Sequence, residues 1–452
     1  MTRLDPPALI GQRKPQILFA HDSWPGQFGG FARWLVSDGW DVWAATGRSP
    51  SAPDGVRVLR YVPHRAPSAA THPYARPFDR AALVGQACVR QCLAARDAGL
   101  SPDLIVSHAG PGAGLFLSEL FPEAVHVAYC EWWYNTPGVD TAWLAEVKRE
   151  HPARAPEAAI LERCRNQPIA QELISAGHGL CPTEFQAAQF PAAFRGMLRV
   201  QHDGIDCAHF RPGPPGHTSH PLLAGLADDT PVVTYATRGM EPHRGFPQIM
   251  AAFAEIQARN PRAVAVIAGD NGVHYGGNAE RRVDWKAEAL RRLDLDESRT
   301  VFTGMLAPED YLWLLRRSDA HVYATVPFVL SWSMLDAMAT GTPLVLSDTA
   351  PVREFADADC AHLAELSDPI DIADKIRDLL DHPGDARRRG HIARERVCAT
   401  CDARRIYPDK AEWLFDLASA TRSVAGAPAP SAPAPVIVSE AASADGASRS
   451  ST

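Results

Sequence analysis

An alternation of apolar strands and amphipathic helices between residues 303 and 354 constrains the fold of this chain most strongly. One apolar strand is predicted over residues 321–325, a helix containing Asp336 follows a polar loop, and a second apolar strand covers residues 344–347. Consecutive parallel strands need a crossover connection, usually a helix, so the alternation predicts a parallel sheet covered by helices. Ligands bind such sheets beyond the carboxyl ends of the strands. We therefore expect the loop at residues 326–333 and Asp336 to face a ligand.

The same alternation runs through most of the 452 residues and predicts two α/β domains. The Pro- and Gly-rich segment 211–220 has the composition of a linker between an N-terminal domain, residues 1–210, and a C-terminal domain, residues 221–402. A helix at residues 403–422 is expected to return to the N-terminal domain. Residues 423–452 are mostly Ala, Pro, Ser and Gly, which predicts a disordered tail. The expected fold is two Rossmann-like, doubly wound domains facing each other across a cleft, a natural site for a nucleotide and a second substrate.

Two arginines, Arg238 and Arg244, flank the first strand-end loop of the predicted C-terminal domain. A buried strand is expected at residues 232–236, directly before this loop, and a helix is expected to begin at Phe246. Guanidinium groups bind phosphate oxygens bidentately, and a helix N-terminus adds partial positive charge. Such a site can hold a diphosphate and stabilise its charge as it leaves. Two arginines in a solvated surface loop are the alternative interpretation.

Four more residues lie where a ligand would approach. Gly29 and Gly30 follow the first predicted strand, where glycines let a backbone come close to a phosphate or sugar, although a plain tight turn explains them equally well. His108 ends a predicted strand and precedes a glycine-rich segment; a structural histidine is the alternative. Asp336 lies on a largely apolar helix, where a buried carboxylate needs a partner such as a ligand hydroxyl.

Charge and patterning exclude several other classes of protein. The net charge of −8, from 45 basic and 53 acidic residues, argues against a nucleic-acid-binding function. No apolar run has the length of a signal peptide or approaches the ~18 residues of a membrane span. We expect a cytoplasmic protein with at most peripheral contact to the inner face of the membrane. The acid pairs Asp294–Asp296 and Asp357–Asp359 do not follow strands in ligand-facing loops, so no metal site is predicted.

Several segments together are similar to those of the retaining glycosyltransferases of family 4, which have the GT-B fold. The similar segments are residues 182–186, 202–206, Arg238, 244–246, 301–304 and 335–343. The resemblance implies that the second domain holds a nucleoside diphosphate sugar, with no cofactor or metal. It also implies that the sugar is moved to a glycan or lipid-linked acceptor, in cell-surface polysaccharide biosynthesis.

The resemblance also implies roles for individual residues. Arg238 and Arg244 match the basic pair on the donor diphosphate, and His108 matches a histidine near the donor sugar. Asp336 matches the second acid of the family's Glu-x7-Glu motif, which binds the ribose hydroxyls. The remaining donor-binding residues implied are Gly29 and Gly30 near the diphosphate, Phe302, Gly304 and Met305 near the base, and Ser331 near the sugar.

One position departs from the family pattern. Phe328 stands where the first acid of Glu-x7-Glu usually contacts the donor sugar, in a Pro-Phe-Val-Leu-Ser-Trp loop that resembles the loop of a subfamily. Sugar contacts are then expected from the backbone amides of this loop or from Ser331. A non-catalytic protein that binds sugar nucleotides is one alternative. An NAD(P)-dependent oxidoreductase is a second, because Gly26, Gly29 and Gly30 loosely resemble a dinucleotide turn; the full Gly-x-Gly-x-x-Gly is absent.

Overall fold

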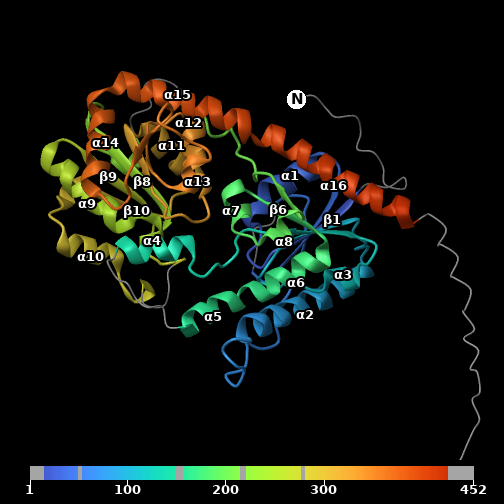
Figure 1. The fold of residues 1–452 in the computed structure, drawn as a ribbon. Helices are drawn as coiled ribbons and strands as arrows, with labels where there is room; N and C mark the ends of the chain where they lie inside the picture. The colour runs from blue at the N-terminus through green and yellow to red at the C-terminus, as the bar shows by residue number, and fades with distance from the viewer. Residues whose placement is uncertain (1–14, 49–52, 148–155, 214–219, 276–279, 426–452) are drawn as a thin grey trace, which may run out of the picture.

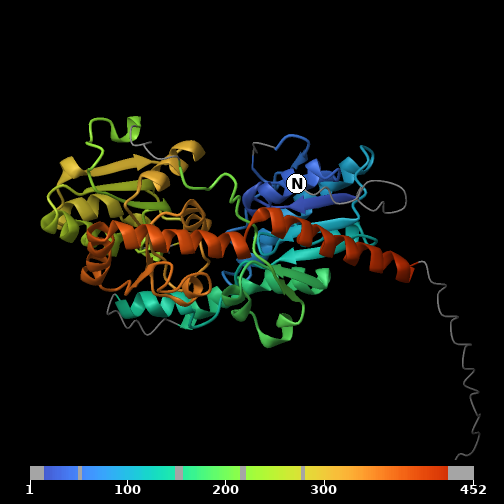
Figure 2. The same cartoon turned by 90° about the horizontal axis from the view of Figure 1, so that it is seen from above.

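The computed structural model describes residues 15–48, 53–147, 156–213, 220–275 and 280–425. These residues form two α/β domains that lie side by side, each with a parallel sheet between layers of helices (Figures 1 and 2). The predicted pair of Rossmann-like domains is therefore confirmed.

The sheet of the N-terminal domain has the strand order β3-β2-β1-β4-β5-β6-β7 in the described part of the chain. Its strands are β1 (Gln16–Ala20), β2 (Asp41–Thr46), β3 (Arg57–Arg60), β4 (Leu104–His108), β5 (Val125–Tyr129), β6 (His178–Cys181) and β7 (Leu198–Val200). The helices are α1 (Gly29–Ser37), α2 (Arg76–Arg96), α3 (Leu117–Leu120), α4 (Val139–Val147), α5 (Pro156–Cys164), α6 (Asn166–Ala176), α7 (Glu184–Ala188) and α8 (Ala192–Arg195), with a short 3-10 helix, η1 (Gly26–Phe28). The central strands are buried on both faces, which explains their continuous apolar sequences.

The sheet of the C-terminal domain has the order β10-β9-β8-β11-β12-β13 within the described residues. Its strands are β8 (Val232–Gly239), β9 (Val264–Asp270), β10 (Thr300–Gly304), β11 (Ala320–Tyr323), β12 (Leu344–Ser347) and β13 (His362–Ala364). The helices are α9 (Phe246–Arg259), α10 (Trp285–Arg292), α11 (Pro308–Arg317), α12 (Trp332–Thr340), α13 (Ala350–Arg353), α14 (Pro369–Asp381) and α15 (Pro383–Thr400). The 3-10 helices are η2 (Pro221–Leu223), η3 (Pro242–Arg244), η4 (Glu280–Arg282) and η5 (Glu297–Arg299).

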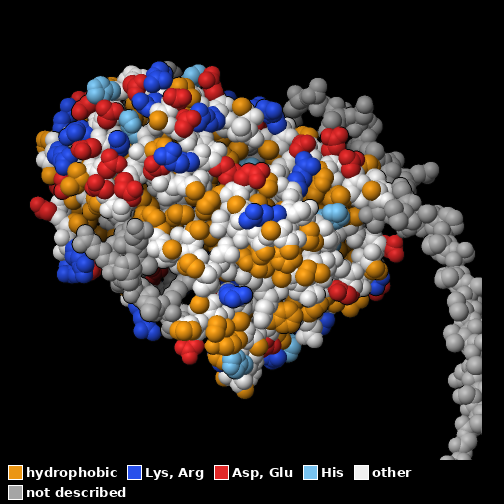
Figure 3. Space-filling view, in the orientation of Figure 1, with side chains coloured by type: hydrophobic (Ala, Val, Ile, Leu, Met, Phe, Trp, Pro, Cys, Tyr) orange, Lys and Arg blue, Asp and Glu red, His pale blue; other side chains and the backbone are white. Residues whose placement is uncertain are grey.

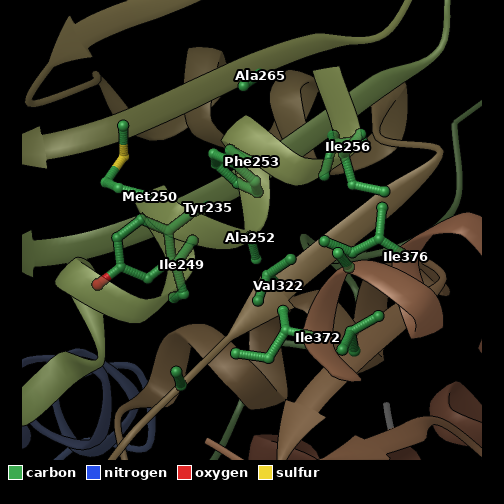
Figure 4. Close-up of a cluster of buried hydrophobic side chains, with 14 of the residues drawn as sticks. Tyr235, Ile249, Met250, Ala252, Phe253, Ile256, Ala265, Val322, Ile372 and Ile376 are labelled. Atoms are coloured by element: carbon green, nitrogen blue, oxygen red, sulfur yellow. The ribbon is translucent and has the colours of Figure 1, made fainter. Parts of the chain in front are cut away.

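A hydrophobic core anchors the first strand of the C-terminal domain. Helices α9 and α14 pack together over the sheet, and their apolar side chains meet those of β8 and β11 (Figure 4). Tyr235 on β8 belongs to this cluster, and its hydroxyl donates a hydrogen bond of 2.8 Å to the backbone oxygen of Arg244. The core therefore holds the turn that carries Arg244.

Both sheets reverse their strand order at a central pair of strands. The reversal lies between β1 and β4 in the N-terminal domain and between β8 and β11 in the C-terminal domain. Ligands of doubly wound sheets bind outside the carboxyl ends of the strands at such a switch point. Arg238 lies near the carboxyl end of β8, Arg244 lies in the segment after β8, and residues 324–331 follow β11, so the topology places them where a ligand would bind.

The last helices join the two domains (Figures 1 and 2). Helix α15 packs against α12 in the C-terminal domain, and α16 (Ala403–Ala425) continues along α1 and β5 of the N-terminal domain. Ala411, Leu414 and Ala418 of α16 are buried in the N-terminal core. In the opposite direction, Leu144 of α4 is buried in the core of the C-terminal domain. Each domain thus receives a helix from the other part of the chain.

Some element boundaries differ from the sequence-based expectation. A single helix is predicted over residues 156–176, but the structure has two, α5 and α6, with Arg165 between them. Pro168 explains the break, because a proline lacks the amide hydrogen and its ring crowds the carbonyl four residues earlier. The predicted tail lies outside the described residues, apart from 423–425, which complete α16. No described helix combines the length and the apolar character that a membrane span requires.

Candidate functional site

A cleft of about 560 Å³ lies between the two domains, at the carboxyl ends of the strands. Its size falls in the range of ~300–1,000 Å³ that is typical of ligand pockets. Residues of both domains line it, including Gln27, Glu131 and Asp203 on the N-terminal side. Of the sequence-predicted residues, Arg238, Arg244, Met305, Ser331 and Asp336 line this cleft.

Arg244 is a buried cation at the wall of the cleft. Its side chain is only 5% exposed, and one guanidinium nitrogen, Nη1, donates to Thr325 Oγ1 at 2.9 Å and to Val329 O at 3.0 Å. The guanidinium carbon lies 4.8 Å from the centre of the Tyr275 ring. Among the described residues, no carboxylate forms an ion pair with Arg244. A buried charge without a counter-ion is costly, so this site favours an anionic ligand.

The turn that directs Arg244 into the cleft depends on Gly245. This glycine has a φ of 66°, and a Cβ atom there would lie 2.8 Å from side-chain atoms of both Ala324 and Leu366. Only glycine adopts this conformation without strain and leaves the space free. The motif Arg244-Gly245-Phe246 thus has a local structural reason: the turn ends η3, and α9 begins directly after it.

Arg238 and Asp336 complete the charged wall on the side of the C-terminal domain. Arg238 is the last but one residue of β8 and is exposed, with no ion pair to another described residue. Asp336 lies on α12, and its carboxylate accepts no hydrogen bond from the described part of the chain. Burial raises the pKa of Asp336 well above its ordinary value of 3.8. A partly buried carboxylate without donors is suited to bind ligand hydroxyls.

The loop before α12 contributes Ser331 rather than Phe328 to the cleft. Ser331 caps the helix, since its side-chain oxygen accepts a hydrogen bond from Ser333 N, and its own backbone nitrogen donates to the Tyr323 hydroxyl at 2.9 Å. Phe328 is turned toward the other domain. Its ring centre lies 4.8 Å from that of Trp132 in the N-terminal domain and 5.3 Å from that of Tyr275.

Only one of the three residues expected near a nucleotide base lines the cleft. Met305 lines it and is 67% exposed, directly after β10. Phe302 instead packs beneath Lys286, whose ammonium lies 4.3 Å from the ring centre. Gly304 is beside the cleft, with a φ of 70° and open space where a Cβ would project.

Gly29 and Gly30 do not line the cleft. They form the first turn of α1, where a Cβ on Gly29 would meet Pro25 and a Cβ on Gly30 would meet the Tyr407 hydroxyl of α16. Their small size therefore allows close packing between segments of the protein. Of the glycines in this loop, Gly26 lines the cleft, with a φ of 45°.

His108 ends β4 behind the cleft wall and faces a residue that the sequence-based reasoning missed, Glu131. His108 Nε2 lies 3.3 Å from Glu131 Oε2, and Glu131 itself lines the cleft. Burial lowers the pKa of His108, but the hydrogen bond to Glu131 and the negative charges of Glu131, Glu172 and Asp203 together outweigh burial, so the pKa is raised above its ordinary value. Glu131 follows a predicted strand closely, so the rule that ligands bind at strand ends could have identified it.

Hydrogen bonds connect the two domains beside the cleft. Trp332 Nε1 of α12 donates to Asp203 Oδ2 at 3.2 Å, and the Tyr129 hydroxyl donates to the same oxygen at 3.0 Å. The Glu354 carboxylate accepts from the backbone nitrogens of Glu184 and Phe185, at 2.8 and 2.9 Å. These contacts fix the distance between the two walls that a ligand would touch.

The two domains match two families of glycosyltransferase domains. Residues 38–210 match the glycosyl transferase family 4 group, and residues 230–382 match the glycosyl transferases group 1. Each match spans one domain and less than half of the 452 residues.

Curated relatives cover part of this chain. A glycogen synthase of Mycobacterium tuberculosis is 28% identical over 210 residues, 45% of this chain and 45% of that protein. A GDP-mannose-dependent monoacylated alpha-(1-6)-phosphatidylinositol monomannoside mannosyltransferase of Corynebacterium glutamicum is 24% identical over 248 residues, 52% of this chain and 58% of that protein. The chain thus matches about half the length of these relatives.

Solved structures share the fold over nearly the whole chain. Sucrose-phosphate synthase from Thermosynechococcus elongatus has a TM-score of 0.64 at 20% identity, covering 90% of this chain and 100% of that chain. HepE of Anabaena, in complex with UDP-glucose, has a TM-score of 0.64 at 16% identity, covering 89% of this chain and 99% of that chain. These similarities confirm the predicted GT-B fold.

Proposed function

We propose that this protein is a retaining glycosyltransferase that takes a sugar from a nucleoside diphosphate carrier and transfers it to a glycan or lipid-linked acceptor. The observation that carries the proposal is the buried guanidinium of Arg244, which faces the interdomain cleft without a described counter-ion. Arg238 adds a second positive charge beside it, and Asp336 offers a carboxylate to ribose hydroxyls. The glycosyltransferase relatives and the resemblance to family 4 support the same function.

In the proposed reaction, the bond between the anomeric carbon and the diphosphate oxygen breaks, and a bond from that carbon to an acceptor oxygen forms. The departing diphosphate gains negative charge, which Arg238 and Arg244 stabilise at fixed positions. The acceptor proton leaves with the diphosphate or to solvent. Catalysis then rests on positioning and on charge stabilisation, with no nucleophile supplied by the protein.

Binding of nucleotide sugars is the first test. A thermal-shift screen would compare UDP-glucose, UDP-galactose, UDP-N-acetylglucosamine, ADP-glucose and GDP-mannose with the corresponding nucleoside diphosphates. A ligand at 100 times its dissociation constant stabilises the folded state by about 2.7 kcal/mol, so the true donor should raise the melting temperature clearly. The absence of any shift across the panel would contradict the proposal.

We also predict that activity does not depend on a divalent metal. In the described ranges, no three His, Cys, Asp or Glu side chains gather closely enough to hold a metal ion, and two arginines are placed to carry the diphosphate charge. Turnover in excess EDTA should equal turnover without it. Complete loss of activity in EDTA, restored by Mg²⁺ or Mn²⁺, would overturn this prediction.

A non-catalytic nucleotide-sugar-binding protein is the second candidate, because Phe328 replaces the usual acid. We predict that Phe328→Glu gives no gain in transfer and lowers stability. The ring is partly buried among Trp132, Tyr275 and His243, so a carboxylate there would lose much of its hydration among aromatic rings. Burying an unpaired polar group costs at least about 1–3 kcal/mol.

The comparison uses nucleoside diphosphate release and melting curves of the wild type, Phe328→Glu and Phe328→Leu. The leucine variant controls for loss of the aromatic ring without adding a charge. A gain of transfer in the glutamate variant would favour a protein that has lost its activity. The third candidate, an NAD(P)-dependent oxidoreductase, leaves Arg244 and Asp336 without a role.

We place the acceptor and any peripheral membrane contact on the side of the N-terminal domain, at the inner face of the membrane. Charged side chains are dense over the upper part of the C-terminal domain, while hydrophobic side chains are more exposed around α6 (Figure 3). Ile174 of α6 is 60% exposed, and Ile160 and Leu161 of α5 are 40% and 39% exposed. Co-sedimentation with phospholipid vesicles tests this contact; protein that stays in the supernatant would contradict it.

A further inference from the structure

Glu131 presents a carboxylate to the cleft from the wall of the N-terminal domain. The residue follows β5, and its side chain is 33% exposed. Gln27 Nε2 donates to Glu131 Oε1 at 2.7 Å, and His108 Nε2 lies 3.3 Å from Glu131 Oε2. The side-chain amide of Gln186 donates to the backbone oxygen of Glu131 at 2.7 Å. Backbone and side chain are therefore both held in place.

The hydrogen bonds behind Glu131 have a defined direction. Ser23 N donates to His21 Nδ1 at 2.9 Å, so this nitrogen is an acceptor. Burial lowers the pKa of His21 to about 3, which keeps the ring neutral with its hydrogen on Nε2. That nitrogen then donates to Gln27 Oε1 at 2.9 Å, which directs the NH₂ group of Gln27 toward Glu131. The chain from His21 through Gln27 thus ends on one carboxylate oxygen.

Glu131 retains capacity to accept hydrogen bonds from a ligand on the N-terminal wall of the cleft. A carboxylate has about four acceptor sites, and each oxygen of Glu131 meets one described donor. Asp203 is tied to Tyr129 and Trp332. Asp336 lies on the opposite wall, on the same domain as the two arginines.

The donor side of the cleft has no acid for the sugar. The loop at residues 327–333 contains no carboxylate, and Phe328 is packed against Trp132. A donor whose diphosphate lies on Arg238 and Arg244 would place its sugar in the cleft whose other wall carries Glu131. A carboxylate there repels phosphate but accepts hydrogen bonds from neutral hydroxyls.

We infer that Glu131 binds hydroxyl groups of the transferred sugar, and so supplies from the N-terminal domain the carboxylate that the loop around Phe328 lacks. This inference rests on the proposed function. His21 is a positioning residue, because it acts on the substrate only through Gln27 and Glu131, whereas Gln27 also lines the cleft itself. The choice of sugar then depends on which hydroxyls reach Glu131 when the cleft is closed.

Calorimetric titration of Glu131→Gln against matched ligands tests the inference. The ligands are UDP, GDP, UDP-glucose and GDP-mannose, and the pair that binds the wild type is used. The variant should bind the nucleoside diphosphate within about twofold of the wild type but bind the nucleotide sugar roughly tenfold more weakly, since one charge-assisted hydrogen bond is lost. Unchanged nucleoside diphosphate affinity also shows that the variant is folded.

Three further variants sharpen the test. Glu131→Asp should restore part of the affinity for the nucleotide sugar, and Gln27→Leu should cause a smaller loss with the same selectivity for the sugar. Glu123→Gln, on the exposed surface of the same domain, should match the wild type.

Two results would overturn this inference but leave the proposed function standing. One is an unchanged affinity of Glu131→Gln for the nucleotide sugar, and the other is an equal loss of affinity for the nucleotide sugar and for the nucleoside diphosphate. A wild type that binds no nucleotide sugar at all would overturn the proposed function and this inference with it.

Discussion

Arg244→Ala is expected to abolish glycosyl transfer and to weaken nucleoside diphosphate binding by roughly 10- to 100-fold, the effect of losing one charge-assisted contact of about 1.5–3 kcal/mol. The guanidinium is buried, points into the cleft and has no described counter-ion. Removing the guanidinium changes the stability of the fold in two opposite ways: an uncompensated buried charge disappears, but the hydrogen bonds to Thr325 and Val329 are lost. Because these effects partly cancel, the variant should still fold. Initial rates and calorimetric titration of the purified variant measure both effects.

Two matched variants separate the charge from its geometry. Arg244→Lys keeps the charge but loses the bidentate fork, so it should bind the diphosphate with an intermediate affinity. Arg262→Ala removes an exposed arginine of the same domain, whose only described ion pair is with Asp229, and should behave as the wild type. Unchanged turnover of Arg244→Ala would remove this residue from the site.

Asp336→Asn is expected to stabilise the ligand-free protein and to weaken nucleoside binding, two effects of opposite sign. Burial raises the pKa of Asp336 in the folded state above its value in the unfolded chain. Between these two pKa values the folded state binds more protons than the unfolded state, so the wild type loses stability as the pH rises through this window. Asparagine does not titrate, and the variant avoids this loss.

Melting curves of both proteins from pH 3 to pH 8 test the stability effect. The two proteins should have similar melting temperatures at the acid end. At neutral pH Asp336→Asn should melt higher, by about 2–4 °C for each kcal/mol gained in the free energy of unfolding. Its affinity for the preferred nucleoside diphosphate should fall about tenfold or more, because charge-assisted bonds to the ribose are lost. Asp294→Asn, an exposed acid of the same domain, is the control. If the variant is less stable at neutral pH but binds the nucleoside diphosphate normally, Asp336 has a structural role and does not bind the ligand.

The architecture and the charged wall could be predicted from the sequence because both follow local patterns. Buried strands alternating with helices predict doubly wound sheets, and the sheet order then places the loop of Arg238 and Arg244 at a switch point. Asp336 follows from the same reasoning, because an acid on an apolar helix needs a partner.

The remaining parts of the site depend on contacts between segments far apart in the sequence. Position 30 has no room for a side chain because Tyr407 of α16 packs against it, and no local sequence pattern indicates that contact. Phe328 packs on Trp132 of the other domain, so its role depends on how the domains close. Glu131 lies beyond a strand end, but its exposure to the cleft follows from the positions of Gln27 and His108.

The central claim is that the cleft binds a nucleoside diphosphate sugar and that Arg244 stabilises the nucleoside diphosphate as it leaves the sugar. The most direct measurement is nucleoside diphosphate release from the panel of nucleotide sugars, with the wild type and Arg244→Ala side by side. We expect the wild type to cleave at least one donor slowly without an acceptor, and Arg244→Ala to leave the same donor intact. Tight binding of a nucleotide sugar without any release, or equal release by both proteins, would contradict the claim.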